Sequence, residues 1–352
     1  MSKGTKLRKE ACYMHYVPVV HQDGSPLMPC KPSRARKLLK DGAAIKKWTK
    51  TGVFYIQLTT PTSKHTQPMV MGLDPGANYD GICITTKKQM QMSGMLIVKN
   101  NIKKKIEVRR NLRRARRWRN CRRRPKRFNN RTRKEGWLPP SIKAKVDMRI
   151  TFTQSLLNIY PVIEFAVEDT KIDGNKLKGK DGRQYFTWVM SGKTKLYNFL
   201  KSKGNLTLYK PEETANARLN CGLIKTSKKG ELVFTSQAVD ALALCQLQIG
   251  TQNLAITSFI VWRRPEIPRR QLHRLKPARG GIRNPYGGST ALGFKKNTVV
   301  EYKGKLYRTG GTSKDRLSLH SFGFENRRII QNAKPQECRP LFQQTWFNKK
   351  IL

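Results

Sequence analysis

The segment from Val70 to Thr86, VMGLDPGANYDGICITT, constrains the fold more than any other part of this sequence. Its first residues, Val70 to Leu73, form an apolar run typical of a buried strand, and Asp74 ends that run before a Pro-Gly turn. The residues from Gly81 predict a strand that returns beside the first, and Gly94 to Val98 predict a third. A carboxylate on the last residue of a central strand is held rigidly and can bind a metal ion. A lone Asp-Pro-Gly is more often a simple turn, so a metal site requires further carboxylates at the same place.

The charge of the chain limits its partners. The 352 residues include 72 Lys and Arg against 22 Asp and Glu, a formal net charge of +50, and so few acids cannot neutralise it. Nucleic acid is the commonest polyanion that can. The sequence contains no run long and apolar enough to span a bilayer, its first residues, MSKGTKLRKE, are too polar for a signal peptide, and its seven cysteines include no C-x-x-C pair. We therefore expect a cytoplasmic protein that binds nucleic acid and no membrane.

A block of positive charge lies at residues 103–127, KKKIEVRRNLRRARRWRNCRRRPKR. Apolar residues between Val108 and Trp118 recur at helical spacing, and Pro125 ends the predicted helix. A disordered basic tail is the alternative, but tails stand at chain ends and this block lies between two segments with folded patterns. We interpret it as a helix contacted by nucleic acid on several sides. Its candidate binding residues are Arg109, Arg110, Arg113, Arg114, Arg116, Arg117, Arg119, Arg122, Arg123 and Arg124.

The segments after this block alternate between helical and strand patterns. They predict helices at 141–158, 193–203 and 235–247, and strands at 162–167 and 206–209. Three strands, a helix, two more strands and a closing helix form the order of a ribonuclease-H-like α/β domain. In that fold Asp74 meets Glu168, at the end of a later central strand, and Asp240, in the last helix. Converging carboxylates repel one another unless a cation holds them, so we predict a site for two Mg²⁺ ions that clamp a phosphodiester during hydrolysis.

Two smaller units flank this core. Residues 1–61 predict an α+β unit near the lower size limit for a free-standing core, so we expect it to pack on a neighbouring part of the chain. Residues 263–352 predict a mostly β region that either grips nucleic acid or caps the core. The predicted core then consists of residues 62–102 and 136–262, with the basic helix inserted at 103–135.

The chain resembles the RNA-guided, transposon-encoded proteins IscB and, more closely, IsrB, which are compact relatives of type II CRISPR effectors. The resemblance covers nearly the whole chain. It rests on PLMP at 26–29, GLDPG at 72–76, the arginine block, VED at 167–169 and AVDA at 238–241. In order, these look like the family's PLMP domain, first RuvC motif, bridge helix, and second and third RuvC motifs. Each short motif is weak alone, but the ordered set is specific.

This resemblance implies an RNA-guided DNA nickase from a prokaryotic mobile element. Its catalytic and metal-binding residues would be Asp74, Glu168 and Asp240, with two Mg²⁺ ions that Mn²⁺ can replace. Its partners would be a long noncoding guide RNA, called omega RNA in this family, and double-stranded target DNA, with one protein copy per ribonucleoprotein. Residues 263–352 would bind the guide RNA and read a short motif beside the target, and the enzyme would cut the non-target strand.

Two features depart from the family pattern. Relatives often carry His three residues before the third acid, where this chain has Gln237, which neither ligates Mg²⁺ strongly nor acts as a base at neutral pH. IscB also inserts a histidine-containing HNH nuclease, but none of the five histidines here lies between Glu168 and Asp240, which favours IsrB and single-strand cutting. Two alternatives stay open: a guide-independent nuclease of the same fold, such as a junction resolvase or transposase, and a non-enzymatic RNA-binding protein.

Overall fold

A seven-stranded sheet organises the computed structural model, with the strand order β20-β10-β7-β6-β5-β8-β9. The model describes residues 16–98, 102–118, 132–173, 188–251, 254, 259–265, 275–276, 281–282 and 289–351. The strands are β5 (Met69–Pro75), β6 (Tyr79–Thr85), β7 (Met90–Ile97), β8 (Val162–Glu168), β9 (Asn205–Tyr209), β10 (Phe259–Arg263) and β20 (Phe347–Ile351). Strand β6 is antiparallel to β5 and β7, whereas β8 is parallel to β5 and to β9. The predicted α/β class is confirmed, and the order β7-β6-β5-β8-β9 is the one that the ribonuclease-H-like prediction requires.

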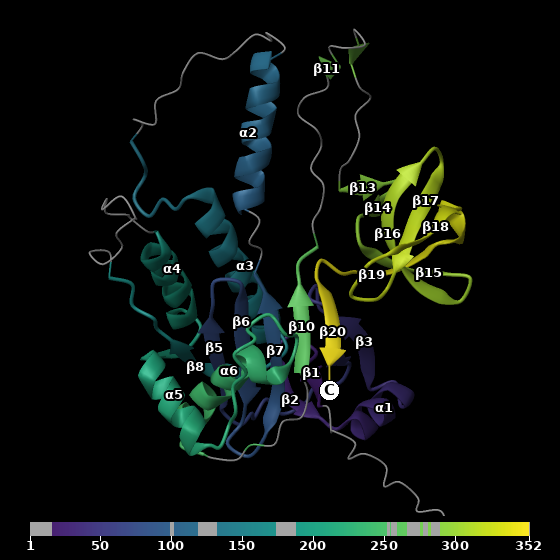
Figure 1. Ribbon diagram of the computed structural model, residues 1–352. Coiled ribbons are helices and arrows are strands. Elements are labelled where there is room, and N and C mark those ends of the chain that lie inside the picture. The colour runs from purple at the N-terminus through teal and green to yellow at the C-terminus, as the bar shows by residue number, and fades with distance from the viewer. Residues whose placement is uncertain are drawn as a thin grey trace, which may run out of the picture.

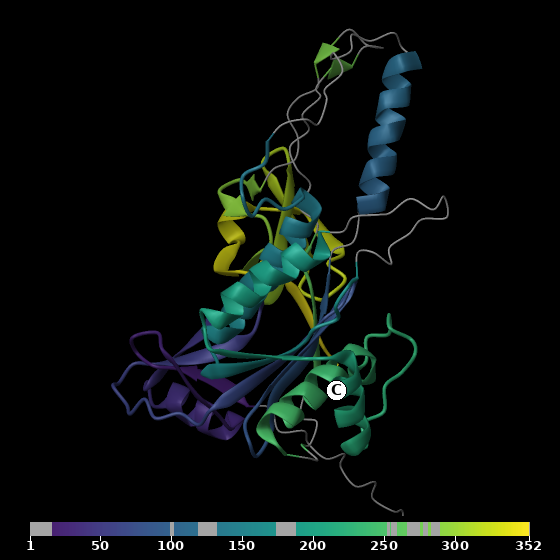
Figure 2. The same cartoon turned by 90° about the vertical axis from the view of Figure 1, so that its left-hand side faces the viewer.

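Helices cover both faces of this sheet (Figure 2). They are α3 (Pro140–Leu157), α4 (Val189–Lys201), α5 (Pro211–Asn220) and α6 (Phe234–Ile249). On one face, Leu73 of β5 belongs to the same core as Phe152 of α3. On the other face, Val70 of β5 packs in a core with Leu242 of α6. Because β5 packs against a core on each face of the sheet, its carboxyl end is held in a fixed position.

Helix α6 lies directly against the sheet because two glycines leave room for it. A Cβ atom on Gly72 of β5 would overlap the carbonyl oxygen of Ala241, and one on Gly81 of β6 would overlap that of Gln237. Backbone can approach backbone this closely only where no side chain intervenes. Asp240 lies on the turn of α6 between these two contacts, so the glycines set its distance from the sheet.

The N-terminal unit is a four-stranded sheet with the order β2-β1-β4-β3 and one helix. Its elements are β1 (Val17–Val20), β2 (Pro26–Cys30), α1 (Pro32–Lys40), β3 (Ala44–Trp48) and β4 (Phe54–Leu58). The unit docks on the C-terminal part of the chain, where the rings of Trp48 and Phe342 stack with centroids 4.8 Å apart. The Asn348 side chain also donates a hydrogen bond of 2.9 Å to the carbonyl oxygen of Gly52. These contacts supply a neighbour to a unit whose own core is small.

The C-terminal region is mostly β, as predicted, and contains a five-stranded antiparallel sheet with the order β18-β17-β16-β15-β19. Its strands are β15 (Thr298–Tyr302), β16 (Lys305–Ser313), β17 (Arg316–Ser321), β18 (Arg328–Ala333) and β19 (Arg339–Gln343). The shorter elements of this region are β11 (Leu275–Lys276), β12 (Gly281–Ile282), β13 (Thr290–Ala291), β14 (Phe294–Lys295) and a 3₁₀ turn (Pro335–Glu337). Lys303 and Gly304 both have positive φ angles, 48° and 71°, which suits the tight turn that joins β15 to β16 as a hairpin. The chain then returns to the central sheet through β20.

Helix α2 (Ile102–Trp118) stands away from the rest of the molecule (Figure 1). All of its side chains that the structure describes between 104 and 118 are exposed. Its predicted apolar stripe is exposed too, with 55% of Leu112 and 89% of Trp118 accessible to solvent. Among the described helices, none has the length and apolar character needed to cross a membrane.

Candidate functional site

Two of the predicted site carboxylates lie side by side at the carboxyl ends of two adjacent parallel strands in the central sheet. Leu73 of β5 is in register with Val167 of the parallel strand β8, so the next residues, Asp74 and Glu168, leave the sheet at the same level. Asp74 is only 9% exposed, whereas Glu168 is half-buried. The strand pairing therefore brings together two acids that are 94 positions apart in the sequence.

The surroundings of Asp74 favour its neutral form. Burial is the largest cause, and the negative charges of Glu168 and Asp240 add to it, while the charge of Lys225 opposes them. Together they raise the pKa of Asp74 from 3.8 to about 8. Glu168 and Asp240 are thus both close enough to Asp74 for their negative charges to oppose its ionisation.

Asp240 differs from the other two acids because cations already hold both of its oxygens. Arg218, in the last turn of α5, donates a hydrogen bond of 2.5 Å to Oδ1. Lys225, in the loop that follows α5, donates to Oδ2. The Asp240 side chain is 2% exposed, against 20% for Arg218 and 29% for Lys225. The third acid of the predicted site is therefore buried and neutralised by protein groups.

A cavity of about 650 Å³ opens in front of Asp74 and Glu168. Gln237, the residue one turn before Asp240, also lines it. Its cationic lining residues are Lys145, Arg149, Lys193, Lys225 and Lys229. A cavity lined by both carboxylates and cations can bind a metal ion at the carboxylates and the phosphates of a nucleic acid at the cations.

The side chains fit a hard divalent cation at Asp74 and Glu168. Mg²⁺ is usually bound by one or two carboxylates, with water and substrate phosphates completing its shell. Within the described residues, no three His, Cys, Asp or Glu side chains are grouped as a metal centre. The pairing of Asp240 with Arg218 and Lys225 explains why it does not complete such a group.

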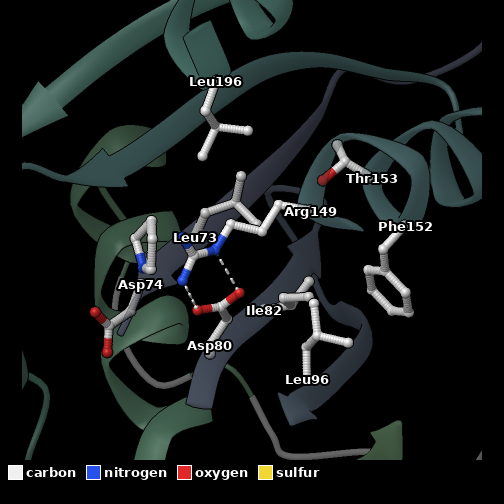
Figure 3. Close-up of a pocket in the computed structure, with 11 residues that line it drawn as sticks. Leu73, Asp74, Asp80, Ile82, Leu96, Arg149, Phe152, Thr153 and Leu196 are labelled. Carbon is white, nitrogen blue, oxygen red and sulfur yellow. Dashed lines mark hydrogen bonds and ion pairs between the residues drawn. The ribbon is translucent and has the colours of Figure 1, made fainter. Parts of the chain in front are cut away.

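A buried ion pair braces the turn that follows Asp74 (Figure 3). Arg149 of α3 donates to both oxygens of Asp80, at 2.8 and 2.7 Å, and to the carbonyl oxygen of Gly76 at 2.6 Å. Burial raises the pKa of Asp80, and the adjacent guanidinium partly offsets that rise. The pair ties β6 and α3 to the Asp74-Pro75-Gly76 turn, so it keeps the first carboxylate in place.

The arginines predicted to bind nucleic acid fall into two groups. Those with described and exposed side chains on α2 are Arg109, Arg110, Arg113, Arg114 and Arg117. Arg116 lies on the same helix, but its side chain is outside the described part, as are Arg119, Arg122, Arg123 and Arg124 altogether. The predicted helical end at Pro125 also lies outside the described residues.

The model of the RRXRR protein family matches residues 17–186, just under half of the chain. The matched segment contains the PLMP sequence, Asp74, helix α2 and Glu168, but not Asp240. Helix α2 carries the pattern of the family's name as RRARR at residues 113–117. No curated protein matches the chain.

Among solved structures, the chain has a distant similarity to RuvC of Thermus thermophilus. For RuvC in complex with a Holliday junction substrate, the TM-score is 0.29 and the identity is 14%, over 53% of this chain and 98% of that one. For the other RuvC structure, the TM-score is 0.27 and the identity is 14%, over 52% of this chain and 97% of that one. Because the similarity is this low, the inferences below rest on the side chains of the site.

Sequence reasoning missed the cations of the site. Lys225 lies in a lysine-rich loop, KTSKKG, where no pattern distinguishes it from its neighbours. Helix α5, which carries Arg218, was also missed, although its start has a recognisable signal: Pro211 in the first turn and Glu213, whose side chain accepts a hydrogen bond of 2.6 Å from the Lys210 backbone. Reading that signal would have predicted the helix, though not the contact with Asp240.

Proposed function

We propose that this chain is a RuvC-like, Mg²⁺-dependent endonuclease that an RNA guides to DNA, where it nicks the non-target strand. One observation carries the nuclease part of the proposal. Asp74 and Glu168 leave adjacent parallel strands at the same edge, with Asp240 close enough to raise the pKa of Asp74. Such a cluster of acids is costly to fold and is typical of sites that use metal ions on phosphate esters.

The side chains divide the work of hydrolysis between them. Asp74 and Glu168 would hold Mg²⁺, which supplies Lewis-acid polarisation of the phosphodiester. Lys145, Lys193 and Lys229 line the same cavity and would bind the phosphates on either side of the cut. Arg149, paired with Asp80, keeps the Asp74 turn from moving when the strand enters.

The RNA-guided part of the proposal is supported by helix α2 and by the family match. The helix exposes five described arginines and a partly aromatic stripe on a chain of net charge +50. An extended basic helix of this kind can be surrounded by nucleic-acid backbone, and the protein would recognise a guide–target duplex by its shape. The matched segment 17–186 spans the PLMP sequence and this helix, both of which carry the resemblance to IscB and IsrB.

The proposal is tested with purified protein and the RNA that copurifies with it. A defined noncoding RNA is expected, and its guide sequence, placed on a supercoiled plasmid, should direct conversion to open circles in Mg²⁺. End-labelled strands should show cutting of the non-target strand alone. Asp74→Asn should remove the activity, whereas Asp147→Asn, an exposed carboxylate of α3 paired with Lys195, should not.

Three outcomes would contradict this function. Rapid accumulation of linear plasmid would exclude a nickase. Cutting of four-way junctions without RNA would favour the guide-independent alternative. Copurification of random RNA, with no cutting of any DNA, would favour a non-enzymatic RNA-binding protein.

A further inference from the structure

Both carboxylate oxygens of Asp240 are contacted by cationic side chains of the protein, in the way that a metal ion would contact them. In a two-ion site the ions lie about 3.5–4 Å apart and each needs free carboxylate oxygens. Here Oδ1 of Asp240 accepts from Arg218 and Oδ2 accepts from Lys225. Both contacts are shielded from solvent, because the carboxylate is only 2% exposed.

Lys225 belongs to the cavity as well as to Asp240. It lines the same space as Asp74, Glu168 and Gln237, and its positive charge acts on Asp74. Its ammonium group therefore already occupies the Asp240 oxygen that a second ion would need. Gln237 supplies no charge that could help to hold such an ion.

The charges of the site give the same answer. Asp74, Glu168 and Asp240, taken with Arg218 and Lys225, carry one net negative charge when all five are ionised, and Lys145 and Lys229 in the same cavity add positive charge. One divalent ion more than neutralises that net charge, whereas two would leave a large positive excess beside the buried carboxylates. Breaking the contacts of Asp240 to admit a second ion would also leave its two partly buried cations without their partner.

We propose that the site binds one divalent ion, through Asp74 and Glu168, and that Lys225 takes the place of the second ion on Asp240. The inference rests on the nuclease function proposed above and changes the two-ion expectation drawn from the sequence. Lys225 acts through Asp240 and is a positioning residue. Arg218 holds the other oxygen and fixes the carboxylate on the helix.

The number of bound ions tests this inference without measuring catalysis. Mn²⁺ serves as the probe, counted by equilibrium dialysis and by electron paramagnetic resonance on the full-length chain freed of nucleic acid. The wild-type chain should bind one Mn²⁺ and give the spectrum of an isolated ion. Lys225→Met should bind a second ion at least about tenfold more tightly than the wild type does, because a partly buried positive charge on Asp240 has been removed. Its spectrum should then show two coupled ions.

Two variants control for charge and for folding. Lys228→Met removes a charge from the same loop, but Lys228 pairs with Glu231 at the surface, so one ion should remain. Lys225→Arg keeps the charge and should also bind one ion. If Lys225→Met does not fold, the wild-type count still decides the question.

Each count has a distinct meaning. Two ions in the wild type would overturn this inference and leave the proposed nuclease intact. No bound ion would overturn the metal site of the proposed function itself. A single ion in a folded Lys225→Met variant would show that Lys225 does not exclude the second one.

Discussion

The Asp74 site and helix α2 differ most in how their charges are neutralised. In the site, Asp240 contacts Arg218 and Lys225, and Asp80 contacts Arg149, all within the protein. On α2, by contrast, every described side chain between 104 and 118 is exposed. Like charges three or four residues apart oppose a helix in isolation, because each repulsion costs a few tenths of a kcal/mol.

The Asp74 site is therefore preformed within the protein, whereas the charges of helix α2 are left without neutralising contacts from the described residues. Cores on both faces of the sheet and fixed ion pairs determine the positions of the carboxylates, so these side chains are held in place without any ligand. Helix α2 has no such support from the described residues, and a polyanion around it would supply both charge and cover for its apolar stripe. We therefore expect mutations in the site to reduce activity or stability, and mutations on helix α2 to reduce RNA affinity.

The largest effect is expected from removing a site carboxylate. Asp74→Ala, Glu168→Ala and Asp240→Ala should each reduce nicking by at least about 100-fold, the scale of losing one preorganised electrostatic contact. Binding of RNA and DNA should be nearly unchanged, because the basic surface stays intact. Nicking assays and filter binding measure the two properties separately.

Asp240 requires its own control in that series. Asp240→Ala leaves two partly buried cations unpaired and can lower stability as well as activity. Asp240→Asn keeps the size of the side chain, and a thermal melt shows whether the fold is retained. Full nicking by any one of these folded variants would remove that residue from the site.

A smaller but still large effect is expected from Gly72→Ala. The added methyl group would overlap the carbonyl oxygen of Ala241 and push α6 away from β5. Strain of this kind costs about 1–3 kcal/mol of stability, and nicking should fall as well, because Asp240 moves with the helix. Gly311→Ala is the matched control, since no atom lies within 4 Å of its added Cβ atom. Equal melting temperatures for the two variants would contradict the close packing of α6.

Two of the candidate acids stand at boundaries that the sequence shows. Asp74 ends an apolar run before Pro-Gly, and Glu168 ends another. The central strands were located for the same reason, although β7 begins at Met90 rather than near Gly94. Gln91 and Ser93 are buried in that strand despite their polarity, so the alternation that reveals a strand was hidden.

What the sequence could not predict depends on contacts between distant segments. Strands β10 and β20 join the central sheet from two places far apart in the chain. The sequence of neither strand indicates which strand it pairs with. The cations on Asp240 come from a helix end and a loop, where local pattern says nothing about contacts. Gly72 was read as part of a motif, yet its role depends on a helix about 170 positions later.

Helix α2 should show the opposite behaviour to the site. Replacing Arg109, Arg113 and Arg117 by Ala should leave the melting temperature of the free protein unchanged, because these side chains are exposed. RNA affinity should fall, and the slope of log affinity against log salt should flatten by about 0.7–0.9 per lost phosphate contact. Lys87, Lys88 and Lys203, exposed lysines outside both α2 and residues 263–352, provide a triple-alanine control. An unchanged slope in the arginine variant alone would mean that these arginines do not contact phosphate.

The smallest effect expected is a pH dependence of metal binding, which only the preformed site should show. In the metal-free chain Asp74 faces Glu168, Asp240, Asp80 and Lys225, and its pKa is about 8 instead of 3.8. Its neutral form is favoured by folding, so the stability that it contributes is complete below about pH 4 and is lost as the pH rises towards 8. A metal ion must displace this proton, so Mg²⁺ affinity should rise by up to about tenfold per pH unit and level off near pH 8. Thermal melts with and without Mg²⁺ at several pH values measure this, and Asp74→Asn should remove the part of the metal-free pH dependence that comes from Asp74, while that of Asp80 remains. A constant Mg²⁺ affinity from about pH 6 to 8 would show that Asp74 is already ionised, and that the neighbouring cations outweigh its burial.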